Sequence, residues 1–352
     1  MSMNYKELGI KIGIHHSKGT YSDGWIAHCE ANNIPYKIVD AYNSSIIEDL
    51  SDCPIFLWHH RHWHPKDFIV ARSVLFSLEQ AGKFVYPDWK SGWHFDDKVG
   101  QKYLLEALGL PLIPSFVFYS KSEALTWAKN IKFPIVFKLK GGASSNNVKL
   151  VRDYQAARKL INKCFGRGFR AFDPYANLLE SWNKLIKGEV GVKDLIKAFM
   201  HFFVPFYVEK TKGRDKGYAY FQEFIPNCTY DIRVQLVGLR GYAMKRTVRK
   251  NDFRASGGGN IDYDGSKLPI EVIQMAQEAA RKIGMQSMAI DILPYKESYV
   301  IAEVCYAFGI DEGELNYGYF NESGQWINDA FDPTHWMLDD SIRSYLEAKA
   351  QA

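Results

Sequence analysis

The sequence lacks the features that mark secreted, membrane-spanning and disulfide-bonded proteins. Its five cysteines are an odd number, are widely spaced and include no CxxC pair, which argues against a disulfide framework or a structural zinc site. The N-terminus, MSMNYKELGIKIGIHH, lacks the continuous apolar core of a signal peptide, and no stretch reaches the roughly 20 apolar residues of a membrane span. We therefore expect a soluble, unprocessed, cytoplasmic chain without a transmembrane span.

The chain also lacks a strong charge of either sign. Its 44 lysines and arginines against 40 acidic residues give a formal net charge of +4, without a sustained basic run. Nucleic acid is therefore not an expected partner. Apolar residues are abundant instead, because 47% hydrophobic and 15% aromatic content over 352 residues is enough for two or three packed units.

Short β-prone runs alternate with helical patterns in residues 1–94, a rhythm typical of a small open α/β domain. A helical pattern over 70–80 ends at Gly82, as a C-capped helix would. Ligands of such sheets bind at loops after the carboxyl ends of strands, and those loops contain HHSKGTYSDG and HHRHWHP. The β-prone runs are IKIGI at 10–14, YKIV at 36–39, IFLW at 55–58 and KFVY at 83–86.

The second of these loops holds His59, His60, His62 and His64 around Arg61. Such a cluster is compatible with a transition-metal site, although adjacent loop residues rarely all face one ion and no cysteine is near. Binding of an anionic substrate group and ordinary polar packing are the two other interpretations. The sequence leaves all three open.

The region up to residue 216 combines strands with helices. Apolar spacing predicts a helix over 97–109, and Ser120 with Glu123 forms a candidate capping box for another. The strand PIVFKLK runs directly into the loop GGASSNN. Residues 152–216 then show helical patterns with the apolar stretch LIKAFMHFFVPFYV. We interpret this as an inserted helical segment whose apolar face belongs to the core, or else contacts a membrane surface or a partner.

The β-rich pieces that follow include a hairpin around PYKE, which brings two carboxylates together. Side chains alternate along a strand, so Glu303 and Cys305 are expected to share one face with Ile301, and the short turn places Asp291 beside them. Two buried carboxylates need a cation, and hard oxygen ligands suit Mg²⁺ bridging nucleotide phosphates. The alternative is that one of the two carboxylates faces solvent.

A glycine-rich loop and several cations offer contacts for phosphate groups. GGASSNN follows Lys138 and Lys140, and its small residues let backbone N–H groups approach phosphate oxygens. The segment DIR contains Arg233, and Arg246 and Arg254 follow, which suits stabilisation of phosphoryl charge. Taken separately, most Gly-Ser loops are turns and most isolated basic residues are solvated surface.

The order of these pieces resembles the ATP-grasp superfamily and, within it, the ribosomal-protein glutamate ligase group. The order is DDK at the head of a helix, a strand ending in lysine, a Gly-rich loop, QEFI, DIR, FRASGGGN, IDIL and EV, over residues 95–310. The resemblance implies an α/β (α+β) fold of ATP-grasp architecture with a small N-terminal open α/β domain and a helical insertion. The implied division is residues 1–94 as the N-terminal domain, 95–151 as the small ATP-grasp subdomain with the Gly-rich loop, 152–216 as the helical insertion, 217–338 as the C-terminal ATP-grasp subdomain and 339–352 as a tail helix.

The resemblance also implies roles for individual residues. Catalytic arginines would surround the γ-phosphate and an acyl-phosphate intermediate, and the Gly-rich loop would close over the nucleotide. The implied catalytic residues are Arg233, Arg246 and Arg254, and the implied Mg²⁺ ligands are Asp291 and Glu303. The implied nucleotide-binding residues are Lys98 and Lys138 at the phosphates, Ser144 and Ser145 in the loop, Gln222, Glu223, Phe224 and Ile225 at adenine, and Asp231 at the ribose.

The chain departs from the family pattern at one metal position. The family has an acidic residue, one spacer and then Asn, whereas this chain has Glu303, Val304 and Cys305. Thiolate is a soft ligand and a poor partner for Mg²⁺. Either water or a nearby acid such as Asp311 takes that position, or metal binding is weak. The FRASGGGN segment is also richer in glycine than its counterpart, which leaves open which of its residues contact substrate.

The function implied by the resemblance is an ATP-dependent, ADP-forming carboxylate–amine ligase. It would form an amide through an acyl phosphate, with Mg²⁺ and ATP bound between the two ATP-grasp subdomains. Its partners would be a small-molecule carboxylate and an amine, with a sugar acid or an amino acid as candidate substrates. ATP-grasp ligases are often dimers, so a homodimer is one candidate assembly, and the sequence leaves the oligomeric state open. The alternatives are an ATP-grasp kinase that phosphorylates a hydroxyl and a non-catalytic nucleotide-binding protein.

Overall fold

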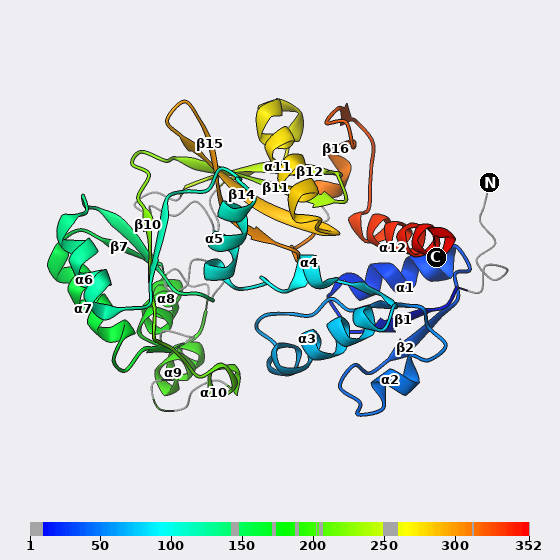
Figure 1. Cartoon of the computed structure of the whole chain (residues 1–352), viewed down its shortest axis with the longest axis horizontal. Helices are drawn as coiled ribbons and strands as arrows, with labels where there is room; N and C mark the ends of the chain where they lie inside the picture. Colours follow the sequence, from blue (N-terminus) through cyan, green and yellow to red (C-terminus); the bar gives the residue numbers. More distant parts are fainter. Residues whose placement is uncertain are drawn as a thin grey trace. The chain divides into compact units, whose positions relative to one another are not determined.

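The structure is a computed structural model that describes residues 10–141, 148–170, 174–186, 190–201, 203, 207–248, 260–311 and 313–351. The chain forms two compact units, each of which combines helices with sheets (Figure 1). The α/β class expected from the sequence is therefore confirmed. The first unit comprises Met1–Phe95, Tyr103–Pro111 and Cys228–Ala352, and the second comprises Asp96–Lys102 and Leu112–Asn227.

The first unit begins with a parallel four-stranded sheet and its helices. The elements are β1 (Ile12–His15), α1 (Tyr21–Ala31), β2 (Tyr36–Val39), α2 (Ile46–Asp49), β3 (Ile55–Leu57), α3 (Pro65–Gln80), β4 (Phe84–Tyr86) and α4 (Trp89–Gly92). The strand order is β2-β1-β3-β4 and every pairing is parallel, so the carboxyl ends of the strands meet at one edge. All four β-prone runs are confirmed. The helix expected over 70–80 begins earlier, at Pro65, because proline suits the first position of a helix.

An antiparallel sheet forms most of the remaining first unit. The elements are β11 (Tyr230–Val237), β12 (Arg240–Thr247), β13 (Ile261–Asp262), η1 (Gly265–Lys267), α11 (Ile270–Ile283), β14 (Ser287–Tyr295), β15 (Ser298–Cys305), η2 (Glu314–Asn316), β16 (Tyr319–Phe320) and β17 (Trp326–Ile327). The strand order is β15-β14-β11-β12-β16-β17, with β13 paired to β12. Buried apolar residues of α11, such as Ile273 and Ala276, cover one face of β11 and β14. The hairpin expected at PYKE is confirmed as β14–β15, and a second hairpin, β11–β12, turns at GLRG.

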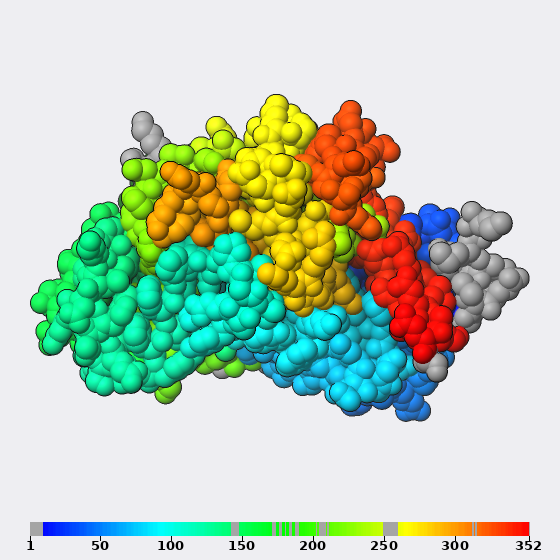
Figure 2. Space-filling model, turned by 45° about the horizontal axis from the view of Figure 1, so that its top comes forward, coloured from blue at the N-terminus to red at the C-terminus, as the bar shows by residue number. Residues whose placement is uncertain are grey.

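Helix α12 (Pro333–Gln351) returns to the parallel sheet and packs against α1, β3 and β4. Figure 2 shows this helix, in red, against the blue N-terminal segment. Gly24 permits the approach, because a Cβ at that position would lie 2.1 Å from Thr334 Oγ1. His28 Nε2 also lies 3.0 Å from Asp339 Oδ1. The tail helix expected over 339–352 is thus part of a longer helix that starts at Pro333.

The second unit is built on a separate antiparallel sheet with the order β5-β10-β6-β7. Its elements are β5 (Ser115–Phe118), α6 (Lys121–Asn130), β6 (Ile135–Lys138), β7 (Lys149–Val151), α7 (Tyr154–Cys164), β8 (Phe169–Arg170), α8 (Pro174–Ile186), α9 (Val192–Met200), α10 (Tyr207–Lys212), β9 (Arg214–Asp215) and β10 (Ala219–Glu223). Helix α5 (Lys98–Ala107) is divided between the units at Lys102. The Ser120 side chain caps α6 by accepting a hydrogen bond from Glu123 N, as its position in the sequence indicates.

The compact units divide the chain at other points than the boundaries expected from the sequence. Strand β10, which was expected in the C-terminal subdomain from residue 217, lies between β5 and β6, with Phe221 packed near Phe137. Helix α7, which was expected in the insertion over 152–216, shares a core with α6 and this sheet. The boundaries of the compact units depend on the pairing of β10 with strands some 80 residues earlier in the chain. Local sequence patterns carry no information about such long-range pairing.

Helices α8, α9 and α10 and the short pair β8–β9 complete the second unit. Helices α8 and α9 contact each other. Within the described ranges, no helix has the length and apolar character needed to cross a membrane.

Candidate functional site

One face of the antiparallel sheet carries Asp231, Arg233, Arg246 and Asp291, which we refer to as the ionic cluster. In the strand register Asp231 is opposite Arg246 and Arg233 is opposite Asp291, so the four side chains share a face. On β11 and β14, the alternating residues Ile232, Ile290 and Ile292 are fully buried. Strand alternation therefore separates the ionic cluster from the apolar core under α11.

Asp291 lies at the centre of the ionic cluster. Arg233 donates to it through Nε at 2.7 Å from Oδ1 and through Nη2 at 2.9 Å from Oδ2, a bidentate pair. Arg246 Nη2 lies 3.0 Å from the same Oδ1. Arg246 also makes a bidentate pair with Asp231, in which Nε donates to Oδ1 at 2.8 Å and Nη2 donates to Oδ2. Each buried carboxylate thus has a guanidinium partner, as a low-dielectric site requires.

Burial and charge act against each other on the pKa values of this cluster. Burial alone would raise the pKa of Asp291, but the Arg233 and Arg246 charges outweigh it and hold that pKa well below its usual range. At Asp231, burial prevails and raises the pKa despite the hydrogen bond from Arg246. Burial would lower the pKa of both arginines, yet Asp291 keeps both pKa values raised. Two fixed cations therefore flank one ionised carboxylate.

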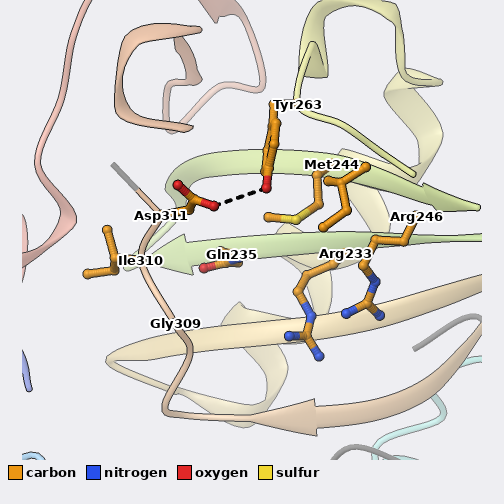
Figure 3. Close-up of a pocket in the computed structure, with 9 residues that line it drawn as sticks. Arg233, Gln235, Met244, Arg246, Tyr263, Gly309, Ile310 and Asp311 are labelled. Carbon is orange, nitrogen blue, oxygen red and sulfur yellow. Dashed lines mark hydrogen bonds between the residues drawn. The ribbon is translucent and has the colours of Figure 1, made fainter. Parts of the chain in front are cut away.

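A cavity of about 520 Å³ adjoins the ionic cluster. In Figure 3, Arg233 and Arg246 project from neighbouring strands, and Tyr263 Oη donates a hydrogen bond to Asp311 Oδ2 at 3.1 Å across the cavity's other wall. The volume is within the range of small-molecule sites, which is roughly 300–1,000 Å³. The lining residues are Arg233, Gln235, Met244, Arg246, Ile261, Tyr263, Gly309, Ile310 and Asp311.

Glu303 lies opposite Asp291 on the neighbouring strand, as the hairpin predicts. The expectation that Ile301 shares this face is wrong. The register shifts between Asp291 and Ile292, so that Ile301 is paired with Ile292 in the core under α11. A β-bulge adds one residue to β15 and reverses the alternation at that point.

The described residues supply two carboxylates at the positions expected to bind a metal, Asp291 and Glu303, but not a complete metal shell. Among them, no group of three or more His, Cys, Asp and Glu side chains is placed to hold a metal ion. Cys305, at the position where the family has Asn, donates its Sγ–H to Ala307 O at 2.9 Å. Asp311 is engaged too, because its Oδ1 accepts a hydrogen bond from Gly313 N at 3.0 Å. Mg²⁺ is usually held by one or two carboxylates with phosphate oxygens and water, a pattern that Asp291 and Glu303 fit.

The residues expected at the nucleotide phosphates lie in the second unit. Lys138 is half-buried at the end of β6. Lys98 is buried at the start of α5, where its backbone N donates to Lys140 O at 2.8 Å. This bond ties the first turn of α5 to the strand end that precedes the Gly-rich loop. Ser144 and Ser145 of that loop lie outside the described residues, as does Arg254.

The segment expected at adenine ends strand β10 and precedes the change of unit. Gln222 is buried and its Nε2 donates to Ser115 Oγ at 3.0 Å. Glu223 is exposed, and Phe224 and Ile225 are half-buried beyond the strand. The second unit ends two residues later. The adenine contact, and the ribose contact assigned to Asp231, stay predictions.

The histidine-rich loop packs closely at the edge of the parallel sheet. His59 Nδ1 accepts a hydrogen bond from Tyr21 N at 3.1 Å, and the two rings stack with centroids 3.8 Å apart. His64 Nδ1 lies 2.7 Å from Oδ1 of the buried Asp67. Asp67 Oδ2 also accepts a hydrogen bond from Arg61 N at 2.7 Å.

Burial lowers the pKa of His59 and of His60 to about 3, so both imidazoles are neutral. Neutral rings at these two positions provide no charge for an anionic substrate, and this loop contributes to no group of three or more possible metal ligands among the described residues. Of the three interpretations, ordinary polar packing accounts for these contacts.

Several cavity residues were missed at the level of the sequence, above all Gln235, Met244 and Tyr263. A signal for two of them was present. Gln235 is two residues after Arg233 and Met244 is two before Arg246, so strand alternation places both on the face of the ionic cluster. Tyr263 and Ile310 come from connecting segments, and no local pattern indicates them.

Two named proteins resemble the chain in sequence, and no family model matches it. The α-aminoadipate–LysW ligase LysX of Saccharolobus solfataricus is 20% identical over 288 residues, which is 78% of this chain and 85% of LysX. The 2-oxoglutarate carboxylase small subunit of Hydrogenobacter thermophilus is 28% identical over 124 residues. That match covers 32% of this chain and only 26% of the subunit's own length.

Solved structures resemble the chain over nearly all of its length. The D-alanine–D-alanine ligase from Bacillus anthracis has a TM-score of 0.57 at 14% identity and covers 97% of this chain and 99% of its own. The RimK domain ATP-grasp protein from Sphaerobacter thermophilus has a TM-score of 0.54 at 14% identity, with 95% and 99% covered. At these identities the likeness is one of fold. The chain has the ATP-grasp fold that the order of its motifs implied.

Proposed function

We propose that this chain is an ATP-dependent ligase that joins a carboxylate to an amine through an acyl phosphate. The ionic cluster beside the cavity carries the proposal. Arg233 and Arg246 are held as cations by Asp291, through hydrogen bonds and an ion pair of 2.7 to 3.0 Å. Fixed cations in a shielded site stabilise the charge that spreads over a transferring phosphoryl group.

Asp291 and Glu303 would hold Mg²⁺, with phosphate oxygens and water completing its shell. An ionised carboxylate offers about four acceptor positions, and in Asp291 the two arginines use two on Oδ1 and one on Oδ2. One position on Oδ2 therefore suits a metal ion. When bound there, Mg²⁺ would neutralise charge on the nucleotide phosphates.

The reaction we propose has two steps. An oxygen of the substrate carboxylate attacks the γ-phosphorus of ATP, the bond to the β,γ-bridging oxygen breaks, and ADP leaves. The amine nitrogen then attacks the acyl carbon, inorganic phosphate departs, and the nitrogen loses one proton to give an amide. Arg233 and Arg246 would stabilise phosphoryl charge in the first step and the departing phosphate in the second.

The names of the similar proteins support this class of reaction. LysX is named a ligase, and the Bacillus anthracis D-alanine–D-alanine ligase has been solved with ATP. The ATP-grasp ligase PsnB has been solved with Mg and ADP. For this chain we propose small-molecule substrates, a carboxylate such as a sugar acid or an amino acid together with an amine. A homodimer and a cytoplasmic location stay predictions.

Phosphorus NMR tests the proposal by following the γ-phosphate of ATP. The purified protein is incubated with Mg²⁺, ATP and fractions of a metabolite extract. ADP and free phosphate that form only when a carboxylate fraction and an amine fraction are both present support the ligase. A new phosphate ester in place of free phosphate indicates a kinase instead.

A non-catalytic nucleotide-binding protein is the second candidate, and Cys305 is the observation that favours it. The thiol replaces a hard metal ligand and is engaged with a backbone carbonyl. ATP binding in a calorimeter together with an unchanged phosphorus spectrum in every substrate pool would establish that role.

A further inference from the structure

Helix α8 exposes an apolar stripe on one side. Tyr175, Leu179, Trp182 and Ile186 are each more than half exposed. They are spaced by four, three and four residues, so they follow one another along a single helix face. Leu178 and Leu185, on the adjoining face, are half-buried instead. The helix thus uses one apolar face for packing and leaves a second apolar face in solvent.

Helix α9 repeats the arrangement. Val192, Ile196 and Phe199 of α9 and Phe203, three residues beyond the end of the helix, have the same spacing, and their exposed fractions lie between 52% and 70%. Nine of the twenty large apolar side chains exposed in the described part of the chain belong to the 29 residues from Tyr175 to Phe203. Exposed apolar residues are common singly, but an aligned group on two contacting helices marks an interaction surface.

The other side of α9 is packed in the second unit, next to an ion pair between β8 and α10. Ala198 of α9 is buried. Arg170 of β8 donates to Glu209 of α10 through Nε at 3.0 Å and Nη2 at 3.1 Å, and its Nη2 also lies 3.2 Å from His201 O. Glu209 is buried within this contact. Ala198 marks the packed side of α9, and the apolar stripe of α9 lies on its exposed side.

The segment that contains these helices is basic as a whole. Residues 152–216 contain 14 Lys and Arg against seven Asp and Glu, a net +7, whereas the rest of the chain has 30 against 33, a net −3. On α9, the exposed Lys193 and Lys197 border the apolar stripe, and Asp194 accepts a hydrogen bond from Gly191 N at the helix start. Residues 174–203, which carry both stripes, contain four lysines against three acidic residues, so most of the basic charge lies in the flanking segments 152–170 and 207–216. Beside the α9 stripe itself, the exposed cations are Lys193 and Lys197.

We propose that α8 and α9 form a docking surface for an anionic lipid bilayer. An apolar stripe rich in aromatic residues and bordered by lysines is the pattern of helices that lie in the membrane interface. The helices have 13 and nine residues, too few for the roughly 20 of a membrane span, so they would lie along the surface. A nucleic acid would use the lysines and leave the aliphatic residues unexplained.

Vesicle sedimentation of the full chain tests the proposal without nucleotide, so the readout is independent of catalytic activity. The vesicles are phosphatidylcholine alone or with about 30% phosphatidylserine, at low and at high salt. We expect binding to the anionic vesicles only, with loss at high salt. The double variant Trp182→Glu/Ile196→Glu removes the stripe, and Lys193→Gln/Lys197→Gln removes the lysine border.

The stripe variant should lose binding by tenfold or more, and the lysine variant by about 30-fold at low salt. The matched control is Ile47→Glu, because Ile47 is similarly exposed, at 54%, in α2 of the first unit. It should bind like the unmodified chain, and circular dichroism confirms that each variant is folded.

Three outcomes would overturn the proposal. One is the absence of binding to either vesicle at low salt, and another is equal binding to neutral and anionic vesicles. The third is that light scattering shows a dimer of the unmodified chain, that the stripe variant is monomeric, and that the unmodified chain does not bind vesicles. In that case a second copy of the chain is the occupant.

Discussion

Two buried polar clusters of the first unit show opposite consequences of burial. In the ionic cluster, Asp291 stays ionised because Arg233 and Arg246 outweigh the cost of its burial. In the histidine-rich loop, burial dominates at His59 and His60 and lowers the pKa of each to about 3. The first cluster retains charge and the second loses it.

The difference teaches that the partners of a buried group, and not its residue type, decide its chemical use. Guanidiniums paired to a carboxylate remain available to a charged ligand in the cavity, since both are cations at any ordinary pH. His59 and His60, which belong to the most conspicuous motif of the sequence, are neutral and packed. We therefore expect substitutions in the two clusters to affect different properties.

Acidification should have the largest effect, through the histidines. The unfolded chain binds a proton at His60 below about pH 6.5, whereas the folded chain does so only near pH 3. Stability is thus complete above pH 6.5 and is lost as the pH falls toward 3. At pH 4 the expected loss is about 3 kcal/mol for His60 and less for the half-buried His59.

Urea unfolding from pH 8 to pH 4 measures this loss. In the variant His60→Phe, the free energy of unfolding should depend less on pH. At pH 8 its stability should match that of the unmodified chain, because His60 Nε2 has no hydrogen-bond partner. An unchanged slope in His60→Phe would contradict the neutral, packed state of this histidine.

Loss of the central carboxylate should be nearly as costly. Asp291→Asn leaves Arg233 and Arg246 without their shared anion in a buried site, and we expect the free energy of unfolding to fall by about 3 kcal/mol. Urea denaturation measures it. The matched control is Asp52→Asn, which removes an exposed ion pair with Lys11 and should change stability little. If the two variants lower the free energy of unfolding equally, the buried carboxylate is no more important for stability than the surface one.

Glu303→Gln should affect turnover and leave the fold intact. The side chain is half-buried opposite Asp291, and the amide is a weaker ligand for Mg²⁺. We expect the rate of ATP-dependent ligation to fall about 100-fold, or 2.7 kcal/mol in the activation free energy. ATP affinity in the absence of Mg²⁺ should stay the same. Full activity in this variant would remove Glu303 from the proposed metal site.

Lys138→Ala tests a cation of the second unit. Of the four changes, it should have the smallest effect, and the quantity that changes is the free energy of ATP binding. Removal of one cation from the nucleotide phosphates should weaken ATP binding about tenfold, equal to 1.4 kcal/mol. Titration calorimetry measures the affinity, with Lys132→Ala as the control because Lys132 is an exposed lysine just before the same strand. If both variants bind ATP equally well, Lys138 does not contact the nucleotide.

Local features of the fold could be predicted from the sequence because they depend on neighbouring residues. The four β-prone runs form the parallel sheet, and Ser120 caps its helix as expected. The hairpin places Glu303 opposite Asp291. The limits of the compact units could not be predicted, since β10 joins a sheet whose other strands begin about a hundred residues earlier in the chain. The bulge that moves Ile301 into the core also has no local signature.

The sequence by itself determined which side chains share a strand face, because alternation along β11, β12 and β14 follows from backbone geometry alone. It also determined the ATP-grasp order of motifs. Only the tertiary structure decided that Asp291 is shared by two arginines, one of them 58 residues away in the chain. Only the tertiary structure decided, too, that His59 and His60 are neutral. Charge state depends on burial and on partners brought together by long-range pairing, and neither is encoded in any one segment.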